Sequence, residues 1–200
     1  MLRILLKFSL SLIILIGLLI GYLSVFGIET NSFNKLIQEE VSKSNENVNA
    51  KLEKVKVLLN LSRLSINLQA SDVDLLFENK IVKLKSISTN YSLKSFINRE
   101  FGIKNVFIST KDNNLNDIIS FIRVYKNSAQ LIILDKIISK GSINANLEIN
   151  FKDNGKIDEN YKIEGKIKGV QINLLNRNNI SEIDFNFDIR KKIYLLKNTK

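Results

Sequence analysis

Acidic side chains are the main candidates for catalytic chemistry in this sequence, because the chain contains no His and no Cys. A Ser-His-Asp or Cys-His arrangement is therefore impossible, and zinc loses its usual ligands. Asp72 and Asp74 stand two positions apart, so an extended backbone would place both carboxylates on one face, where they could bind calcium or act in hydrolysis. The alternating residues around them favour a polar strand end instead. We expect no catalytic residue, no metal site, no cofactor and no enzymatic activity.

The most regular patterns in the chain are rows of apolar residues that alternate with polar ones, which makes them candidates for binding hydrocarbon. Such alternation places all the apolar side chains on one face of a strand. The segment from Ile143 to Phe151 follows it at every position, and the segments 64–70, 161–168 and 183–189 follow it closely. The candidate lipid-binding residues are Leu64, Ile66, Leu68, Ile143, Leu147, Ile149, Phe151, Ile163, Ile167, Phe185 and Phe187.

These apolar rows need a cover. Burying one large aliphatic side chain is worth roughly 1.5 to 3 kcal/mol, so the row from Ile143 to Phe151 alone would lose on the order of 8 kcal/mol if it stayed in water. A second sheet or a helix packed over the rows would give a closed core. Acyl chains of lipid would serve equally well, and the sequence has few helical segments to spare for the first arrangement.

The remaining periodicity predicts helices and turns. Apolar residues spaced by three and four positions predict a short helix after Glu29 and a second helix over 113–125. Asn154-Gly155 has the composition of a tight hairpin turn, so the strands after it form an antiparallel meander. We expect a mainly β (α+β) fold, in which an N-terminal transmembrane helix precedes an elongated, curved antiparallel β-sheet that forms an open groove, with two short helices.

Residues 8–28 contain no charged side chain and are long enough, at roughly 31 Å as a helix, to cross a bilayer. Arg3 and Lys7 precede this stretch and Glu29 follows it, which predicts a cytoplasmic N-terminus. A cleaved secretory signal is the alternative, although its apolar core should be shorter. We therefore divide the chain into a signal anchor (1–28), a juxtamembrane helix with a first strand block and helix (29–126), and a β meander (127–200) that continues in a longer protein.

The formal net charge of +10 raises the question of an anionic partner. The lysines are interspersed with acidic residues and stand mostly at the polar positions of alternating segments, as on solvated strand faces. This distribution favours no nucleic-acid partner, and leaves a weak preference for anionic lipid head groups as the alternative.

The anchor, the juxtamembrane stretch 30–37, the early alternating segment 64–70 and the later segments 161–169 and 183–189 together span most of the chain. In these features the chain resembles the N-terminal portion of the AsmA-like (TamB-like) family, the bridge-like lipid-transfer proteins of the bacterial envelope. The resemblance implies a bacterial inner-membrane anchor, a periplasmic β-groove with an apolar lining, and a role in moving phospholipid toward the outer membrane. Members of this family are usually much longer, so transport by this chain alone is a separate question.

The function expected from sequence is a membrane-anchored protein of outer-membrane biogenesis that binds or guides phospholipid along an apolar β-groove. Its partners would be phospholipid, the inner membrane and other envelope proteins. The alternative is a membrane-anchored assembly or adaptor protein whose β domain is closed and which binds its partner through a strand edge.

Overall fold

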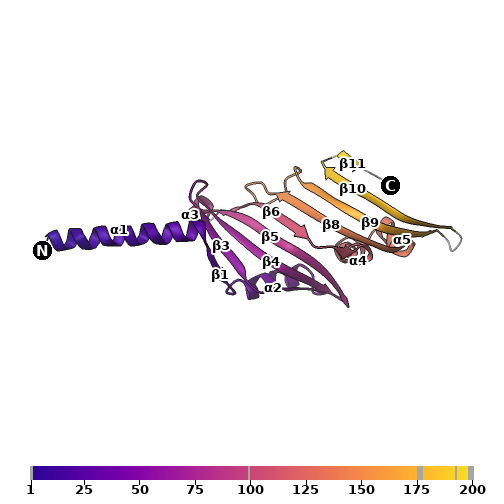
Figure 1. Ribbon diagram of the computed structural model, residues 1–200, viewed down its shortest axis with the longest axis horizontal. Helices are drawn as coiled ribbons and strands as arrows, with labels where there is room; N and C mark the ends of the chain where they lie inside the picture. The colour runs from indigo at the N-terminus through magenta and orange to yellow at the C-terminus, as the bar shows by residue number, and fades with distance from the viewer. Residues whose placement is uncertain (1, 99, 175–177, 192, 198–200) are drawn as a thin grey trace.

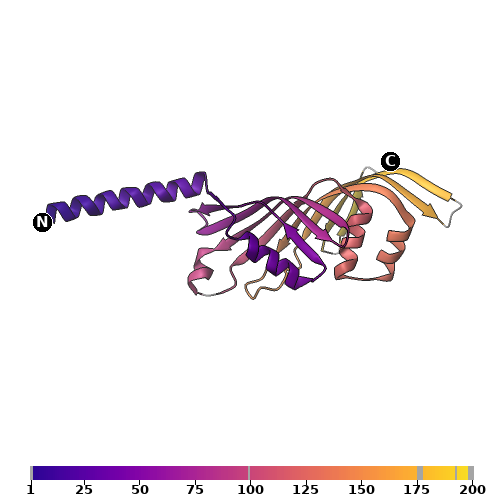
Figure 2. The ribbon, with the colours of Figure 1, turned by 90° about the horizontal axis from the view of Figure 1, so that it is seen from below.

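A long N-terminal helix leads into one antiparallel sheet with short helices beneath it, as the computed structural model shows (Figure 1). The structure describes residues 2–98, 100–174, 178–191 and 193–197. It confirms the expected fold class, because the described chain is mainly β and its sheet is open, elongated and curved (Figures 1 and 2).

Five helices and eleven strands make up the described chain. The helices are α1 (Leu2–Val25), α2 (Asn34–Ser44), α3 (Leu93–Asn98), α4 (Leu115–Tyr125) and α5 (Ala129–Ile137). The strands are β1 (Ile28–Thr30), β2 (Val48–Lys51), β3 (Val55–Asn60), β4 (Ser65–Phe77), β5 (Lys80–Ser92), β6 (Ile103–Thr110), β7 (Asn113–Asn114), β8 (Ile138–Asn150), β9 (Lys162–Leu174), β10 (Asn178–Arg190) and β11 (Ile193–Lys197).

Helix α1 projects away from the sheet (Figure 1). Most of its described side chains are exposed, and only Ile20, Leu23 and Ser24 near the sheet are half-buried. Its segment Arg3–Val25 is long and apolar enough to cross a membrane. The expected anchor is slightly too long at its C-terminal end, because Ile28 belongs to strand β1 and pairs with Val57. Ile28, the last residue of the apolar run, is therefore the first residue of the edge strand β1.

The sheet follows the order of the chain almost throughout, namely β1-β3-β4-β5-β6-β8-β9-β10-β11. All pairs are antiparallel, as expected when short turns join neighbouring strands. Strands β2 and β3 pair with the two halves of β4, and the short β7 pairs with β8. The β6–β8 pair joins the two regions separated at residue 126, so that one sheet runs through both.

In the paired strands β4 and β5, the alternation of core-facing and outward-facing residues shifts by one residue at the same point along the pair. In β4 the residues on the core side are Leu68 and Ala70 before Asp72, and Val73 after it, so the apolar positions pass from even to odd numbers. Asp72 has a left-handed φ of 53°, which inserts the extra residue. In β5 a register shift between Leu84 and Ser86 has the same effect. The matched shifts keep the apolar side chains of both strands on one face.

All four short helices lie on the same side of the sheet (Figure 2). Helices α2 and α4 occur where the spacing of apolar residues predicts them. Helices α3 and α5 were not predicted, and the region of α5 was assigned to the meander. Its apolar residues are nearly continuous from Leu131 to Leu134, a pattern that does not distinguish a helix from a buried strand.

The helices bury two apolar cores against the sheet, and α4 contributes to both. In the first core, α2 and α4 cover strands β2 to β5; its buried members are Val48, Ala50, Leu52, Val55, Ala70, Val73, Phe77, Val82 and Leu84. In the second core, α4 and α5 cover the ends of β8 and β9 farthest from α1; its buried members are Leu115, Ile119, Ile138 and Val170.

Candidate functional site: the apolar face of the sheet

The apolar rows predicted from sequence line up across the sheet. Leu147 of β8 lies opposite Ile108 of β6 and Ile163 of β9. On the next row toward α4, β8 and β9 meet at Ala145 and Gly165, and the row after that joins Ile143, Ile167 and Phe185. Since residues paired in register point to the same side, these rows form one surface, which we call the apolar face. The helices lie on this face.

Helices already cover part of the apolar face. Leu68 packs against the first core, and Ile143 and Ile167 pack against the second. For these three candidates, protein rather than lipid supplies the neighbouring hydrocarbon. This part of the expected groove is a closed core.

A second part of the apolar face lies outside both cores and is half-buried. It runs mainly along the strand ends nearer to α1, and Phe185 extends it on β10 beside the covered Ile167. It comprises the candidates Ile66, Leu147, Ile149, Ile163, Phe185 and Phe187. We call these six residues the uncovered rows. The Phe187 ring lies over Gly165, where a Cβ atom would come within 2.6 Å of it. A glycine opposite an aromatic residue thus keeps the surface even.

Two candidates do not lie on the strand rows. Leu64 precedes β4, in the turn after β3, with a left-handed φ of 47° and 61% of its surface exposed. Phe151 follows β8 and packs against Phe101, with a ring separation of 5.8 Å. Alternation extended across a turn explains both differences, because the sequence does not show at which residue a strand begins or ends.

The two acidic candidates stand beside an irregularity in β4 rather than on an extended backbone. Asp72 forms an ion pair with Lys111 at 2.7 Å, and both side chains are largely exposed. The hydrogen bond to Asp72 raises the pKa of the Lys111 ammonium above its usual value. Asp74 lies in register with Lys83 of β5. No group of three or more metal-ligating side chains occurs in the described residues.

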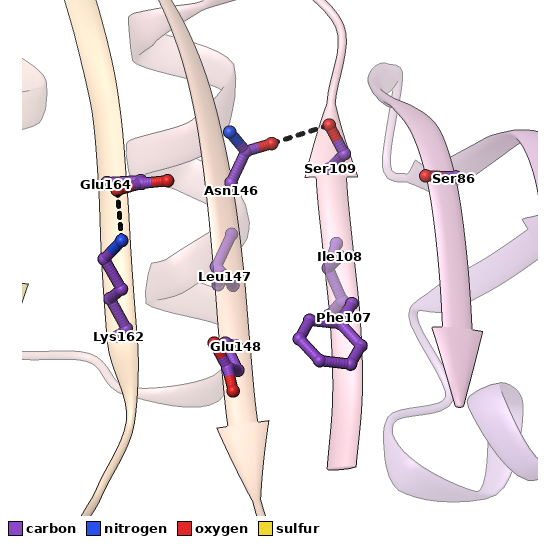
Figure 3. Close-up of a pocket in the computed structure, with 9 residues that line it drawn as sticks. All are labelled: Ser86, Phe107, Ile108, Ser109, Asn146, Leu147, Glu148, Lys162 and Glu164. Atoms are coloured by element: carbon purple, nitrogen blue, oxygen red, sulfur yellow. Dashed lines mark hydrogen bonds and ion pairs between the residues drawn. The ribbon is translucent and has the colours of Figure 1, made fainter. Parts of the chain in front are cut away.

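The opposite, polar face contains a shallow hollow that the sequence did not predict (Figure 3). Its volume is about 240 Å³, and Phe107, which is 38% exposed, is its apolar member on this side of the strands. The polar groups around it already interact with one another, since Ser109 donates to the Asn146 Oδ1 atom at 2.7 Å and Lys162 pairs with Glu164. Ile108 and Leu147 lie on the far side of the strands in this view. The hollow is therefore separate from the apolar face.

Asparagine side chains cross four strands of the polar face in one line. Asn67 donates to Asn90 at 3.1 Å and Asn90 donates to Asn105 at 3.1 Å, while Asn150 lies opposite Asn105. Asn90 accepts from Asn67 and donates to Asn105, so these three amides satisfy part of one another's hydrogen-bonding capacity. The two faces thus differ strongly in chemistry, and only the apolar face offers a surface for hydrocarbon.

The described chain therefore combines a helix of membrane-spanning length with an open sheet that is partly covered on its apolar face. Neither the acidic pair nor the polar hollow brings together groups with a common chemical task. No protein-family model, curated protein or solved structure matches the chain.

Proposed function

We propose that this chain is a membrane-anchored protein of the bacterial envelope that binds phospholipid acyl chains on the uncovered rows of its apolar face. The observation that carries the proposal is the continuity of these rows. From β4 to β10, each strand places an apolar or aromatic residue on this side outside the two helix-covered cores, and Tyr91 of β5 and Val106 of β6 link Ile66 to the rows of β8 to β10. Acyl chains are a suitable cover, since each buried methylene contributes about 0.8 kcal/mol.

The proposal includes a location and an orientation. Helix α1 would span the inner membrane, with Arg3 and Lys7 on the cytoplasmic side and the sheet in the periplasm. The resemblance to the AsmA-like family supports a role in supplying phospholipid to the outer membrane. In this arrangement the sheet begins at the membrane surface, because only Phe26 and Gly27 separate α1 from β1.

A photo-crosslinking experiment tests lipid binding in cells. A photo-reactive side chain placed at Leu147 or Phe185 should form adducts with phospholipid, detected by mass spectrometry of the purified protein. Asn146 is the matched control, because it neighbours Leu147 in β8 but lies on the polar face. Adducts with protein alone at both apolar positions would contradict the proposal.

A charged substitution on the apolar face tests whether this part of the face is an open surface or a closed core. Leu147→Glu should leave the circular dichroism spectrum and cooperative unfolding intact, while abolishing lipid capture at Phe185. Val73→Glu is the comparison, because Val73 is 1% exposed beneath the helices and a charge there should unfold the domain. If Leu147→Glu also unfolds the domain, its surroundings are a closed core.

The second candidate function is that of an assembly or adaptor protein, and the last strand favours it. Strand β11 ends the sheet order, and β10 is its partner among the described strands. It exposes Ile193, Leu195 and Leu196 by 44 to 66%. Such an edge can accept a strand of another protein. Protein adducts at Leu147 together with unfolding of Leu147→Glu would favour this function over lipid binding.

A further inference from the structure

Exposed apolar side chains gather at the end of the sheet where α1 joins it. Two segments lie there in both views, the turn between β3 and β4 and the short helix α3 (Figures 1 and 2). We call their exposed apolar and basic residues the rim, which comprises Leu61, Arg63, Leu64, Lys94 and Ile97.

The position of the rim beside α1 follows from strand pairing. Strand β1 begins two residues after the end of α1. Strand β3 pairs antiparallel with β1, with Val57 opposite Ile28. Strand β3 then continues to Asn60, past the level of Ile28, and α1 contacts β3. Gly27 fixes this joint, because a Cβ atom there would lie 2.6 Å from the Val57 carbonyl oxygen. The rim is therefore held at the end of the membrane-spanning helix.

A hydrogen bond connects the β3–β4 turn to α3, so the two segments lie side by side. The backbone N–H of Leu93, the first residue of α3, donates to the Leu64 carbonyl oxygen at 2.9 Å. The Asn60 side chain closes the turn by accepting from the backbone N–H of Arg63 at 3.1 Å. Leu64 adopts a left-handed φ that is unfavourable for a Leu residue, and in this conformation its side chain is exposed.

The rim has the composition of a membrane-contact surface. The exposed fractions of its apolar residues are 50% for Leu61, 61% for Leu64 and 78% for Ile97. Arg63 and Lys94 are exposed between them, and neither the turn 61–64 nor α3 contains an acidic residue. Apolar side chains suit the boundary between head groups and acyl chains, and basic side chains suit the phosphates.

We propose that the rim inserts into the surface of the same bilayer that α1 spans, as a second and shallower membrane contact. Leu61, Leu64 and Ile97 enter the head-group region, and Arg63 and Lys94 pair with lipid phosphates. This inference rests on the anchoring of α1 but not on lipid binding by the sheet. It also brings the bilayer close to Ile66, the first of the uncovered rows, two residues after Leu64.

Tryptophan fluorescence tests the proposal without background, because the chain contains no Trp. The full chain would be reconstituted into phosphatidylcholine vesicles with anionic lipid, with or without bromine atoms on the acyl chains. Leu64→Trp and Ile97→Trp should each lose intensity in brominated vesicles and emit at shorter wavelength. Ile133→Trp is the matched control, since Ile133 is a 56% exposed apolar residue on α5 at the opposite end of the molecule.

A fourth variant, Ile13→Trp within α1, keeps the result interpretable. If Ile13→Trp is quenched while Leu64→Trp and Ile97→Trp behave like Ile133→Trp, the rim proposal is wrong and the anchor stands. If Ile13→Trp is also unquenched, the anchoring of α1 fails and the rim proposal fails with it. Circular dichroism of each variant confirms that the sheet is intact.

Discussion

Gly27 is the residue on which the joint between helix and sheet depends. It is buried, its φ is 71°, and the Val57 carbonyl oxygen and the Leu58 side chain occupy the space beside its Cα atom. A left-handed φ and a close approach of backbone are the two conditions that favour glycine over other residues. The sequence shows a Gly after an apolar run but cannot show this requirement, because it depends on β3, thirty positions away in the chain.

We expect Gly27→Ala to destabilise the sheet domain by about 1 to 3 kcal/mol, because the methyl group forces β1 away from β3. Chemical unfolding in detergent micelles would measure the loss, and hydrogen exchange should accelerate at Ile28–Thr30. Gly17→Ala in α1 is the matched control, because apart from the neighbouring helix backbone nothing lies within 4 Å of the added methyl group. Equal stability of the two variants would contradict this account of the joint.

Left-handed residues also mark the limit of sequence-based prediction. Alternation predicted the rows around Ile66 and Leu147, because a period of two depends only on the strand itself. It placed Leu64 in a strand and Asp72 on an extended backbone, yet both residues have a positive φ. A single left-handed residue costs only about 1 to 2 kcal/mol, so tertiary contacts can impose it at positions with no distinctive sequence.

At the scale of elements, α4 determines how much of the apolar face is closed. Its Ile118, Phe121 and Val124 pack on the first core, whereas Leu115 and Ile119 belong to the second. The sequence predicted this helix but not which strand rows it covers. Docking depends on α5 as well, and α5 was missed. An ion pair between Arg123 and Asp135 joins the two helices.

Ile119→Ala should cost about 2 to 4 kcal/mol of stability, because Ile119 is 5% exposed and the substitution leaves a cavity in the second core. Ile122→Ala on the same helix should cost less than about 1 kcal/mol, since Ile122 is 44% exposed. Urea titrations of both variants would measure the difference. Similar losses would indicate that α4 does not close this core.

At the scale of the whole molecule, one sheet separates two chemical environments. Side chains on one face contact the helices and, in our proposal, lipid. The other face consists largely of Asn, Ser, Lys and Glu side chains, which contact water. Composition and alternation predicted this separation, because it depends on the type and order of residues. They could not predict the division of the apolar face into covered and uncovered parts, which depends on where the helices dock.

We expect stability to vary little between about pH 5 and 9, because the chain has no His. The ion pairs of this protein lower the pKa of acidic groups and raise the pKa of basic groups, which moves both further from neutral pH. The hydrogen bond from Lys104 lowers the pKa of Asp153 below its usual 3.8, so the contribution of this pair is lost only as the pH falls through that lowered value. The hydrogen bond to Asp72 raises the pKa of Lys111 above 10.5, so the contribution of that pair is lost only as the pH rises through the raised value. Unfolding at a series of pH values would measure this, and a transition near neutral pH would contradict it.

The matched shift in β4 and β5 has an evolutionary consequence. Deleting Asp72 alone would remove the extra residue from β4, so Val73 would stay on the side of Ala70 by regular alternation, but Lys85 of β5 would lose the residue opposite it. A second deletion, of Lys85 in β5, would make the two paired strands equal in length again. Gains and losses of single residues at this level therefore preserve the pairing of β4 with β5 only when they occur in both strands.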